Sequence, residues 1–318
     1  MSAARWRLWA ALCGALVAIA LIAIGPPPSL HEDTLRDLLL ARDCLAGRGC
    51  LGASTSFPGL RQHGLWVRFL AALTGGGLDV AAIHLVISIA NGLAAAVVLR
   101  LAAPLVAAST AFAAALASAA LFALACDAPV LWNPSLAPLS QAVLYAGLLG
   151  LARAGGWPHA ALAGLGVALV TEVHVAGALT LALLVIVVVA YARRPALALA
   201  VGLAVFFAVE ALASREPIAQ NLGAPVIVRV LLPLWAAGLT WCGLWAGWLR
   251  RFGDEPRARA IVVLVVSLGV ATAAPLAGAV ATGHFLDARY FLAGVIPAAL
   301  LGAVALERWR RPSADQQP

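Results

Sequence analysis

The residues with the clearest potential for chemistry form one ionisable run, HEDTLRD, at positions 31–37. Glu32 and Asp33 are adjacent carboxylates, and such a pair can supply a general base together with an orienting or metal-binding partner. A structural role is also open, because Asp33 or Thr34 can cap a helix and leave the other charges on a solvated face. The run therefore predicts either a reactive site or the first turn of a surface helix.

Two further positions place polar groups beside apolar runs. Glu172 and His174 could hold a divalent cation, position a substrate or form a simple polar turn. Asn133 precedes Pro134 and could either contact a substrate or form an Asx-type turn. Each residue is a candidate that the neighbouring elements must bring toward the first run.

Cys44 and Cys50 lie six residues apart in the longest polar segment of the chain. In an oxidising compartment, so close a pair could form a disulfide that rigidifies this segment. The spacing is not by itself that of a zinc site.

The composition decides which elements position these residues. Of the 318 residues, 63% are apolar and 11% are charged. Soluble domains are about 45–50% apolar and about 25% charged, so the composition excludes a soluble globular protein, a disordered chain and a disulfide scaffold. The chain is predicted to be an all-α polytopic transmembrane protein that forms a single domain over residues 1–318.

The apolar runs predict about ten spans, at about 20 residues each. They are residues 8–24, 78–99, 104–125, 135–152, 157–171, 174–191, 195–213, 226–249, 260–281 and 289–306. The stretch 157–191 must form two short helices or one long tilted helix. Two helices are favoured, because they leave Arg193 and Arg194 on the same side as most other arginines.

Residues 25–77 form the expected outer loop between the first two spans. Leu35, Leu38, Leu39 and Leu45 give an apolar stripe, which predicts an amphipathic interfacial helix. Residues 64–75 are apolar but too short to span, so we expect a re-entrant or interfacial piece.

All 21 basic residues are arginine, and most stand singly or in pairs beside apolar runs. Such positions are typical of topology signals rather than of a nucleic-acid surface, and no nucleic-acid partner is expected. With both termini in the cytoplasm, 13 of the 21 arginines are cytoplasmic, and most acidic residues lie at the outer face. The expected location is a bacterial inner membrane, crossed many times.

This layout resembles the GT-C superfamily of membrane glycosyltransferases, in particular the protein O-mannosyltransferases and the aminoarabinose transferases. The similarity lies in a short N-terminus, one span, an outer loop that opens with the acidic pair Glu32–Asp33, and an amphipathic helix along the membrane. The chain resembles a short form without the C-terminal periplasmic domain of longer relatives. The resemblance implies a GT-C-like fold and transfer of a sugar from a polyprenyl-phosphate donor to an envelope glycan, lipid or protein. It implies that Asp33 is the base and that Glu32 assists it.

Such a transfer needs a cation at the donor phosphate, and arginine suits bidentate phosphate contacts. Arg229 and Arg289 are the best placed, with Arg215 behind them. The Arg289–Tyr290 pair at the start of the last span is also common in the superfamily. The remaining residues expected around the acceptor cavity are His31, Arg36, Asn133, Glu172, His174 and Tyr290.

Two other functions stay open. A transporter or flippase of a lipid-linked sugar would place ionisable side chains deep in the spans. A non-catalytic membrane subunit would tolerate changes at Glu32 and Asp33. No cofactor is certain, although a divalent cation is open at Glu172 and His174. The sequence has no P-loop and no HExxH motif, which argues against ATP-driven transport and metalloprotease activity.

Overall fold

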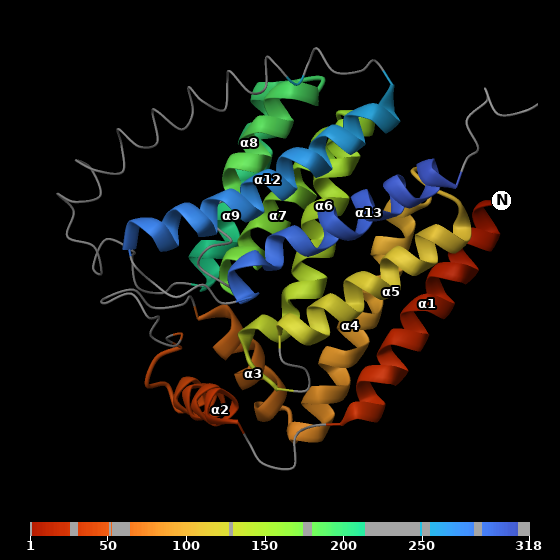
Figure 1. The fold of residues 1–318 in the computed structure, drawn as a ribbon. Coiled ribbons are helices and arrows are strands. Elements are labelled where there is room, and N and C mark those ends of the chain that lie inside the picture. The colour runs from red at the N-terminus through yellow and green to blue at the C-terminus, as the bar shows by residue number, and fades with distance from the viewer. Residues whose placement is uncertain are drawn as a thin grey trace, which may run out of the picture.

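The computed structural model describes residues 2–25, 31–50, 52, 64–126, 130–173, 180–213, 249, 255–282 and 288–310. Within these ranges every regular element is a helix. The elements are α1 (Ala3–Ile24), α2 (Glu32–Leu45), α3 (Leu65–Gly75), α4 (Val80–Ala102), α5 (Ala108–Ala125), η1 (Asn133–Leu136), α6 (Ala137–Ala154), α7 (Trp157–Val173), α8 (Thr180–Tyr191), α9 (Pro195–Ala213), α12 (Pro256–Thr282), η5 (Ala288–Gly294) and α13 (Val295–Trp309). Figure 1 shows them as a helical bundle, with α2 and α3 at one end.

Six of the described helices are long and apolar enough to cross a membrane, which makes the chain a helical membrane protein. They are α1, α4, α5, α6 with η1, α12, and α13 with the end of η5. The helices α7, α8 and α9 are apolar but shorter, and the expected span 226–249 lies outside the described residues except for Leu249. The stretch 157–191 contains two helices, α7 and α8, as the sequence favoured.

Several helix ends that carry arginine lie together at one end of the bundle. Arg153, at the end of α6, donates to the carbonyl oxygen of Leu101 at the end of α4. Arg257, at the start of α12, donates to the carbonyl oxygen of Leu105 at 2.7 Å. The ends of α4 and α6 therefore lie beside the start of α12, so α12 runs back from the end of the bundle that α4 and α6 reach.

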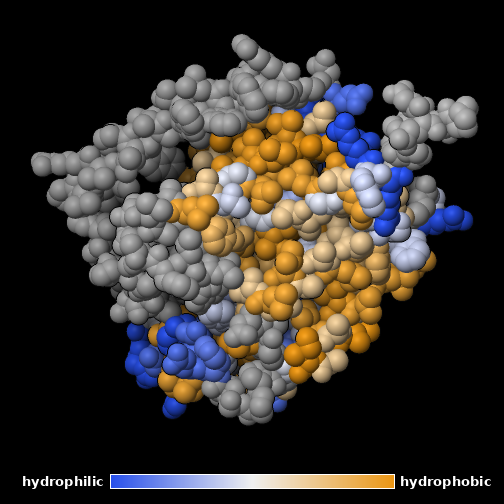
Figure 2. Space-filling model, in the orientation of Figure 1, coloured by the Kyte–Doolittle hydropathy of each residue, from blue (hydrophilic) through white to orange (hydrophobic). Residues whose placement is uncertain are grey.

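This arrangement separates the charges of the described residues. The basic end carries ten arginines and two acidic residues: Arg5, Arg7, Arg100, Arg153, Arg193, Arg194, Arg257, Arg259, Arg308, Arg310, Glu255 and Glu307. The acidic end carries seven acidic residues and four arginines: Glu32, Asp33, Asp37, Asp43, Asp79, Glu172, Glu210, Arg36, Arg42, Arg48 and Arg68. Figure 2 shows hydrophilic residues at opposite corners of the molecule, with a broad apolar surface between them.

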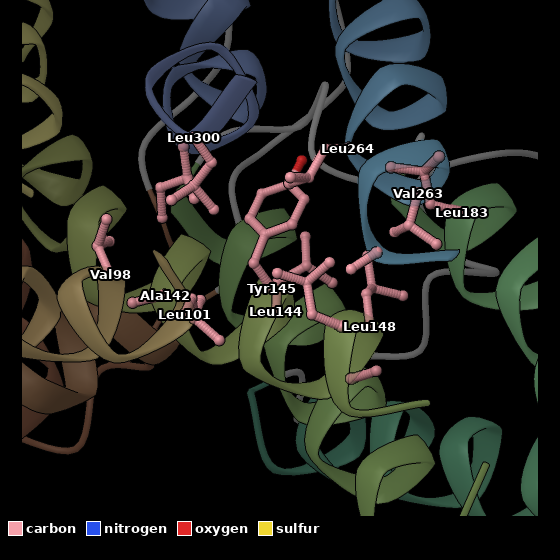
Figure 3. Packing of buried hydrophobic residues seen from close by; sticks show 14 of the residues in the cluster. Val98, Leu101, Ala142, Leu144, Tyr145, Leu148, Leu183, Val263, Leu264 and Leu300 are labelled. Atoms are coloured by element: carbon pink, nitrogen blue, oxygen red, sulfur yellow. The ribbon is translucent and has the colours of Figure 1, made fainter. Parts of the chain in front are cut away.

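One part of the core lies between α6, α12 and α13. Tyr145 of α6 is completely buried, and its hydroxyl donates to the carbonyl oxygen of Ala293 at 2.8 Å. Leu148, Leu264 and Leu300 are equally inaccessible and surround the ring (Figure 3). The hydrogen bond satisfies the one polar atom that this aromatic side chain brings into the apolar interior.

Helix α2 has the surface of an interfacial helix. Leu35, Leu39 and Leu45 are exposed, whereas Asp37 is buried against the rest of the protein. An apolar face turned away from the protein suits contact with the membrane, because it would be unfavourable in water. The disulfide Cys44–Cys50 links the last turn of this helix to the segment that follows it.

Candidate functional site

The N-terminal turn of α2 holds most of the polar residues that the sequence singled out. The side chain of His31 caps the helix, and its Nδ1 accepts a hydrogen bond from the backbone N–H of Asp33 at 3.3 Å. Asp33 forms an ion pair with Arg36, one turn further on. Helical periodicity brings this pair together, because residues three apart lie on one face.

Arg36 also contacts a second carboxylate, that of Asp37, at 2.8 Å. The guanidinium therefore joins Asp33 and Asp37, whereas Glu32 is exposed to solvent. The two carboxylates differ in access, since the Asp33 side chain is 22% exposed and that of Asp37 is 2% exposed. Of the two carboxylates that Arg36 joins, the Asp33 carboxylate is therefore the one that can meet a ligand from outside.

Asp37 was not among the predicted site residues, although it is the buried acid of this helix. Its Oδ2 accepts a hydrogen bond from the indole Nε1 of Trp66 on α3 at 2.8 Å. Burial raises the pKa of Asp37, and the hydrogen bonds from Arg36 and Trp66 together with the charge of Arg36 oppose this rise. The spacing of Thr34, Asp37 and Ala41 is the signal that could have indicated it, because it places the three residues on one helix face. The structure buries all three side chains.

Helix α3 connects this turn to α7. The backbone N–H of Leu65, adjacent to Trp66, donates to Oε2 of Glu172 at 3.3 Å. Glu172 is buried, and Arg68 and Glu210 lie close enough to influence it electrostatically. The start of α3 is therefore held between a carboxylate of α2 and a carboxylate of α7.

The turn before α6 completes the arrangement. The ring of Trp132 lies 6.4 Å from the imidazole of His31, measured between centroids. Asn133 donates through Nδ2 to the carbonyl oxygen of Val173 at 2.8 Å, directly after Glu172. Asn133 thus ties this turn to the end of α7, which is a structural use of its amide.

We call the residues that these contacts join, directly or through their chain neighbours, the acidic-end cluster. Its members are His31, Asp33, Arg36, Asp37, Trp66, Trp132, Asn133 and Glu172. Five of them were predicted from the sequence, and Asp37, Trp66 and Trp132 were not. The structure brings the five together although up to 141 positions separate them along the chain, counted from His31 to Glu172.

Several predicted residues cannot be assigned to the cluster. Arg215, Arg229 and His174 lie outside the described residues. Arg289 and Tyr290 belong to η5, and their side chains lie outside the described part of the structure. The phosphate-binding role of these arginines therefore stays a prediction.

The described side chains offer no group of three or more His, Cys, Asp or Glu residues suited to a metal ion. Oε2 of Glu172 is occupied by the hydrogen bond from Leu65. The cluster offers one partly exposed carboxylate, that of Asp33, for chemistry. Arg36 holds it in one orientation, and the imidazole of His31 lies beside it.

The chain matches no protein-family model, and no curated protein matches its sequence.

Proposed function

We propose that the chain is a membrane glycosyltransferase that moves a sugar from a polyprenyl-phosphate donor to an acceptor hydroxyl of a cell-envelope glycan, lipid or protein. The observation that carries the proposal is the position of Asp33. It is a partly exposed carboxylate in the first turn of a surface helix that exposes Leu35, Leu39 and Leu45, at the acidic end of a helical membrane protein. An acceptor outside the membrane and a donor within it could both reach such a position.

In the proposed reaction, Asp33 takes the proton of the acceptor hydroxyl. The acceptor oxygen forms a bond to the anomeric carbon of the sugar, and the bond from that carbon to the phosphate oxygen breaks with its electron pair. The phosphate carrier leaves with the added negative charge, which a cation must stabilise. Arg229 and Arg289, with Arg215 behind them, are proposed for that task, and Tyr290 for the adjoining wall.

The other members of the acidic-end cluster support Asp33 in this proposal. Arg36 fixes the orientation of the carboxylate, and the buried Asp37 fixes Arg36. Glu32 is exposed beside Asp33 and would contact the acceptor. Glu172 and His174 would shape the acceptor cavity or hold a divalent cation.

We further propose a bacterial inner membrane, about ten spans and two cytoplasmic termini. The separation of charge supports this orientation, because arginine-rich helix ends favour the cytoplasmic side. The acidic-end cluster would then face the periplasm, where the Cys44–Cys50 disulfide is stable.

The test is mass spectrometry of lipid-linked sugars and envelope glycans from cells with the wild-type chain, a deletion, Asp33→Asn or Asp43→Asn. Asp43 is the matched control, because it lies on the same helix, pairs with Arg48 and is 48% exposed. We expect donor accumulation and loss of one glycan residue in the deletion strain and with Asp33→Asn, and a wild-type pattern with Asp43→Asn. Loss of a general base lowers rates about 100-fold or more.

A deletion that changes the envelope while Asp33→Asn does not would overturn the assignment of the base. The chemistry would then lie elsewhere, and transport or a partner protein would explain the deletion.

A further inference from the structure

A cavity of about 50 Å³ lies within the bundle, beside the turn that carries Trp132 and Asn133. Its walls come from α1, α4, α5 and the turn that leads into α6, with Val17 and Phe122 among the apolar residues that line it. A water molecule needs about 10–15 Å³ of such space, so the cavity has room for several waters or for the end of a slender chain.

One side of the cavity is polar. His84, Ser88 and Asn91 line it from α4, at the i, i+4 and i+7 positions that share one helix face. They lie about 6 to 16 Å along the axis from the start of α4, at a rise of about 1.5 Å per residue. These three side chains therefore carry hydrogen-bonding groups well into the apolar part of the bundle.

The hydrogen-bonding capacity of this stripe is not used up by the described protein. Asn91 donates through Nδ2 to the carbonyl oxygen of Ser135 at 3.0 Å, but its buried Oδ1 accepts no hydrogen bond. His84 and Ser88 are 6% and 2% exposed, and their side chains make no hydrogen bond to the described residues. Buried polar groups are rarely left without a partner, so the stripe points to a ligand in the cavity.

The chemistry of the lining defines that ligand. The described lining holds no Arg, Asp or Glu and is mostly apolar, so it favours a neutral ligand over a phosphate or carboxylate. Ser88 lines the cavity with a hydroxyl that can accept a hydrogen bond as well as donate one. A hydroxyl group of a ligand can donate to it and accept from it, whereas an ester or ether cannot donate.

The route of entry favours a membrane amphiphile. Trp9 of α1 contacts Phe112 of α5 near the basic end. The two helices separate toward the other end (Figure 1). The cavity is lined by the later parts of both helices, together with α4. Both helices expose apolar side chains beside it, among them Ile19 and Leu124. We propose that this cavity binds the hydroxyl end of a neutral long-chain membrane alcohol, with the chain passing between α1 and α5 into the lipid.

The test uses the full chain in lipid nanodiscs and photoreactive hexadecanol, with a diazirine on its chain, compared with the methyl ether of the same probe. We expect the alcohol to label α1, α4 or α5, unlabelled hexadecanol to compete, and the ether to label about tenfold less, since it cannot donate a hydrogen bond to Ser88. Ser88→Leu, which fills the polar side, should abolish this labelling, as should His84→Leu. Ser118→Ala is the matched control, because Ser118 is buried on α5 and bonds to the carbonyl oxygen of Ala115 outside the cavity.

Folding of each variant is checked by its thermal unfolding and elution. If Ser88→Leu fails to fold, the comparison of alcohol with ether on the wild-type chain still decides the proposal. Equal labelling by the two probes, or labelling that persists in folded Ser88→Leu, would overturn it. So would an absence of cavity labelling in the wild-type chain, which would mean that water satisfies the stripe.

Discussion

The buried carboxylate of Asp37 on α2 accepts a hydrogen bond from the indole nitrogen of Trp66 on α3, with 2.8 Å between Oδ2 and Nε1. The residue before Trp66 donates its backbone N–H to Glu172 on α7. A surface helix is thus connected to the membrane bundle through the first turn of α3. The position of Asp33 on that surface helix depends on these two contacts.

Trp66→Phe should destabilise the protein. The substitution keeps the ring that stacks on Phe69 but removes the N–H donor, so the buried Asp37 loses a partner. Such a loss costs about 1–3 kcal/mol, and we expect a lower midpoint of thermal unfolding in detergent. Trp157→Phe is the control, since the Trp157 side chain is mostly exposed. Combining Trp66→Phe with Asp37→Asn should cost less than the sum of the single changes, and strict additivity would contradict the coupling.

The pKa of Asp37 predicts a dependence of stability on pH. Burial raises this pKa in the folded protein above its ordinary value of 3.8, so between the two values the folded state binds more protons than the unfolded state. Stability contributed by Asp37 should therefore be present below the ordinary value and decline as the pH rises through the raised pKa. Thermal unfolding from about pH 4 to about pH 7 should show this decline in the wild-type chain and a flatter curve for Asp37→Asn. An identical slope in the two chains would contradict it.

Close packing of α1 on α4 predicts that a glycine-to-alanine substitution is unfavourable at Gly92 on α4, in contrast to the same substitution at Gly269 on α12. A Cβ at Gly92 would lie 2.5 Å from the carbonyl oxygen of Gly14 and 2.8 Å from Cβ of Ala18, so Gly92→Ala must push the helices apart. We expect a loss of about 1–3 kcal/mol. A Cβ at Gly269 on α12 meets nothing within 4 Å, so Gly269→Ala should be neutral or stabilising. Equal melting midpoints for the two variants would show that α1 and α4 do not pack in this way.

Much of the helical layout could be predicted, because runs of apolar residues report directly on membrane helices. The split between α7 and α8 followed from the positions of Arg193 and Arg194, since the charge pattern adds direction to hydropathy. Three of the four leucines expected on the apolar stripe of α2 are exposed, whereas Leu38 packs against a buried cluster that includes Trp66. The number of spans stays a prediction, as does membership of the GT-C superfamily.

The composition of the cluster was harder to predict. Local spacing showed that Asp33 and Arg36 could meet, but not that Asp37 faces Trp66, which lies 29 positions away. Asn133 was expected either at a substrate or in an Asx-type turn, and the sequence did not show that its amide contacts the backbone of Val173, 40 positions further on. Such pairings depend on how helices pack against each other, and one sequence does not encode this in any local pattern.

The separation of charge predicts that two engineered cysteines, one at the start of α4 and one just before α5, face opposite sides of the membrane. Ala81 is exposed in the first turn of α4 at the acidic end, and Ala107 is exposed before α5 at the basic end. In intact cells, a membrane-impermeant maleimide should label Ala81→Cys and should reach Ala107→Cys only after the membrane is permeabilised. Both substitutions are made in a chain that carries Cys242→Ser, and that chain is the control. Of its other cysteines, Cys13 and Cys126 are buried and Cys44 is bonded to Cys50. Reversed labelling would contradict the proposed orientation, and labelling of both variants in intact cells would contradict a membrane crossing by α4. Because the arginine-rich ends favour the cytoplasm, labelling of Ala81→Cys alone would also place Asp33 on the side where an envelope acceptor is found.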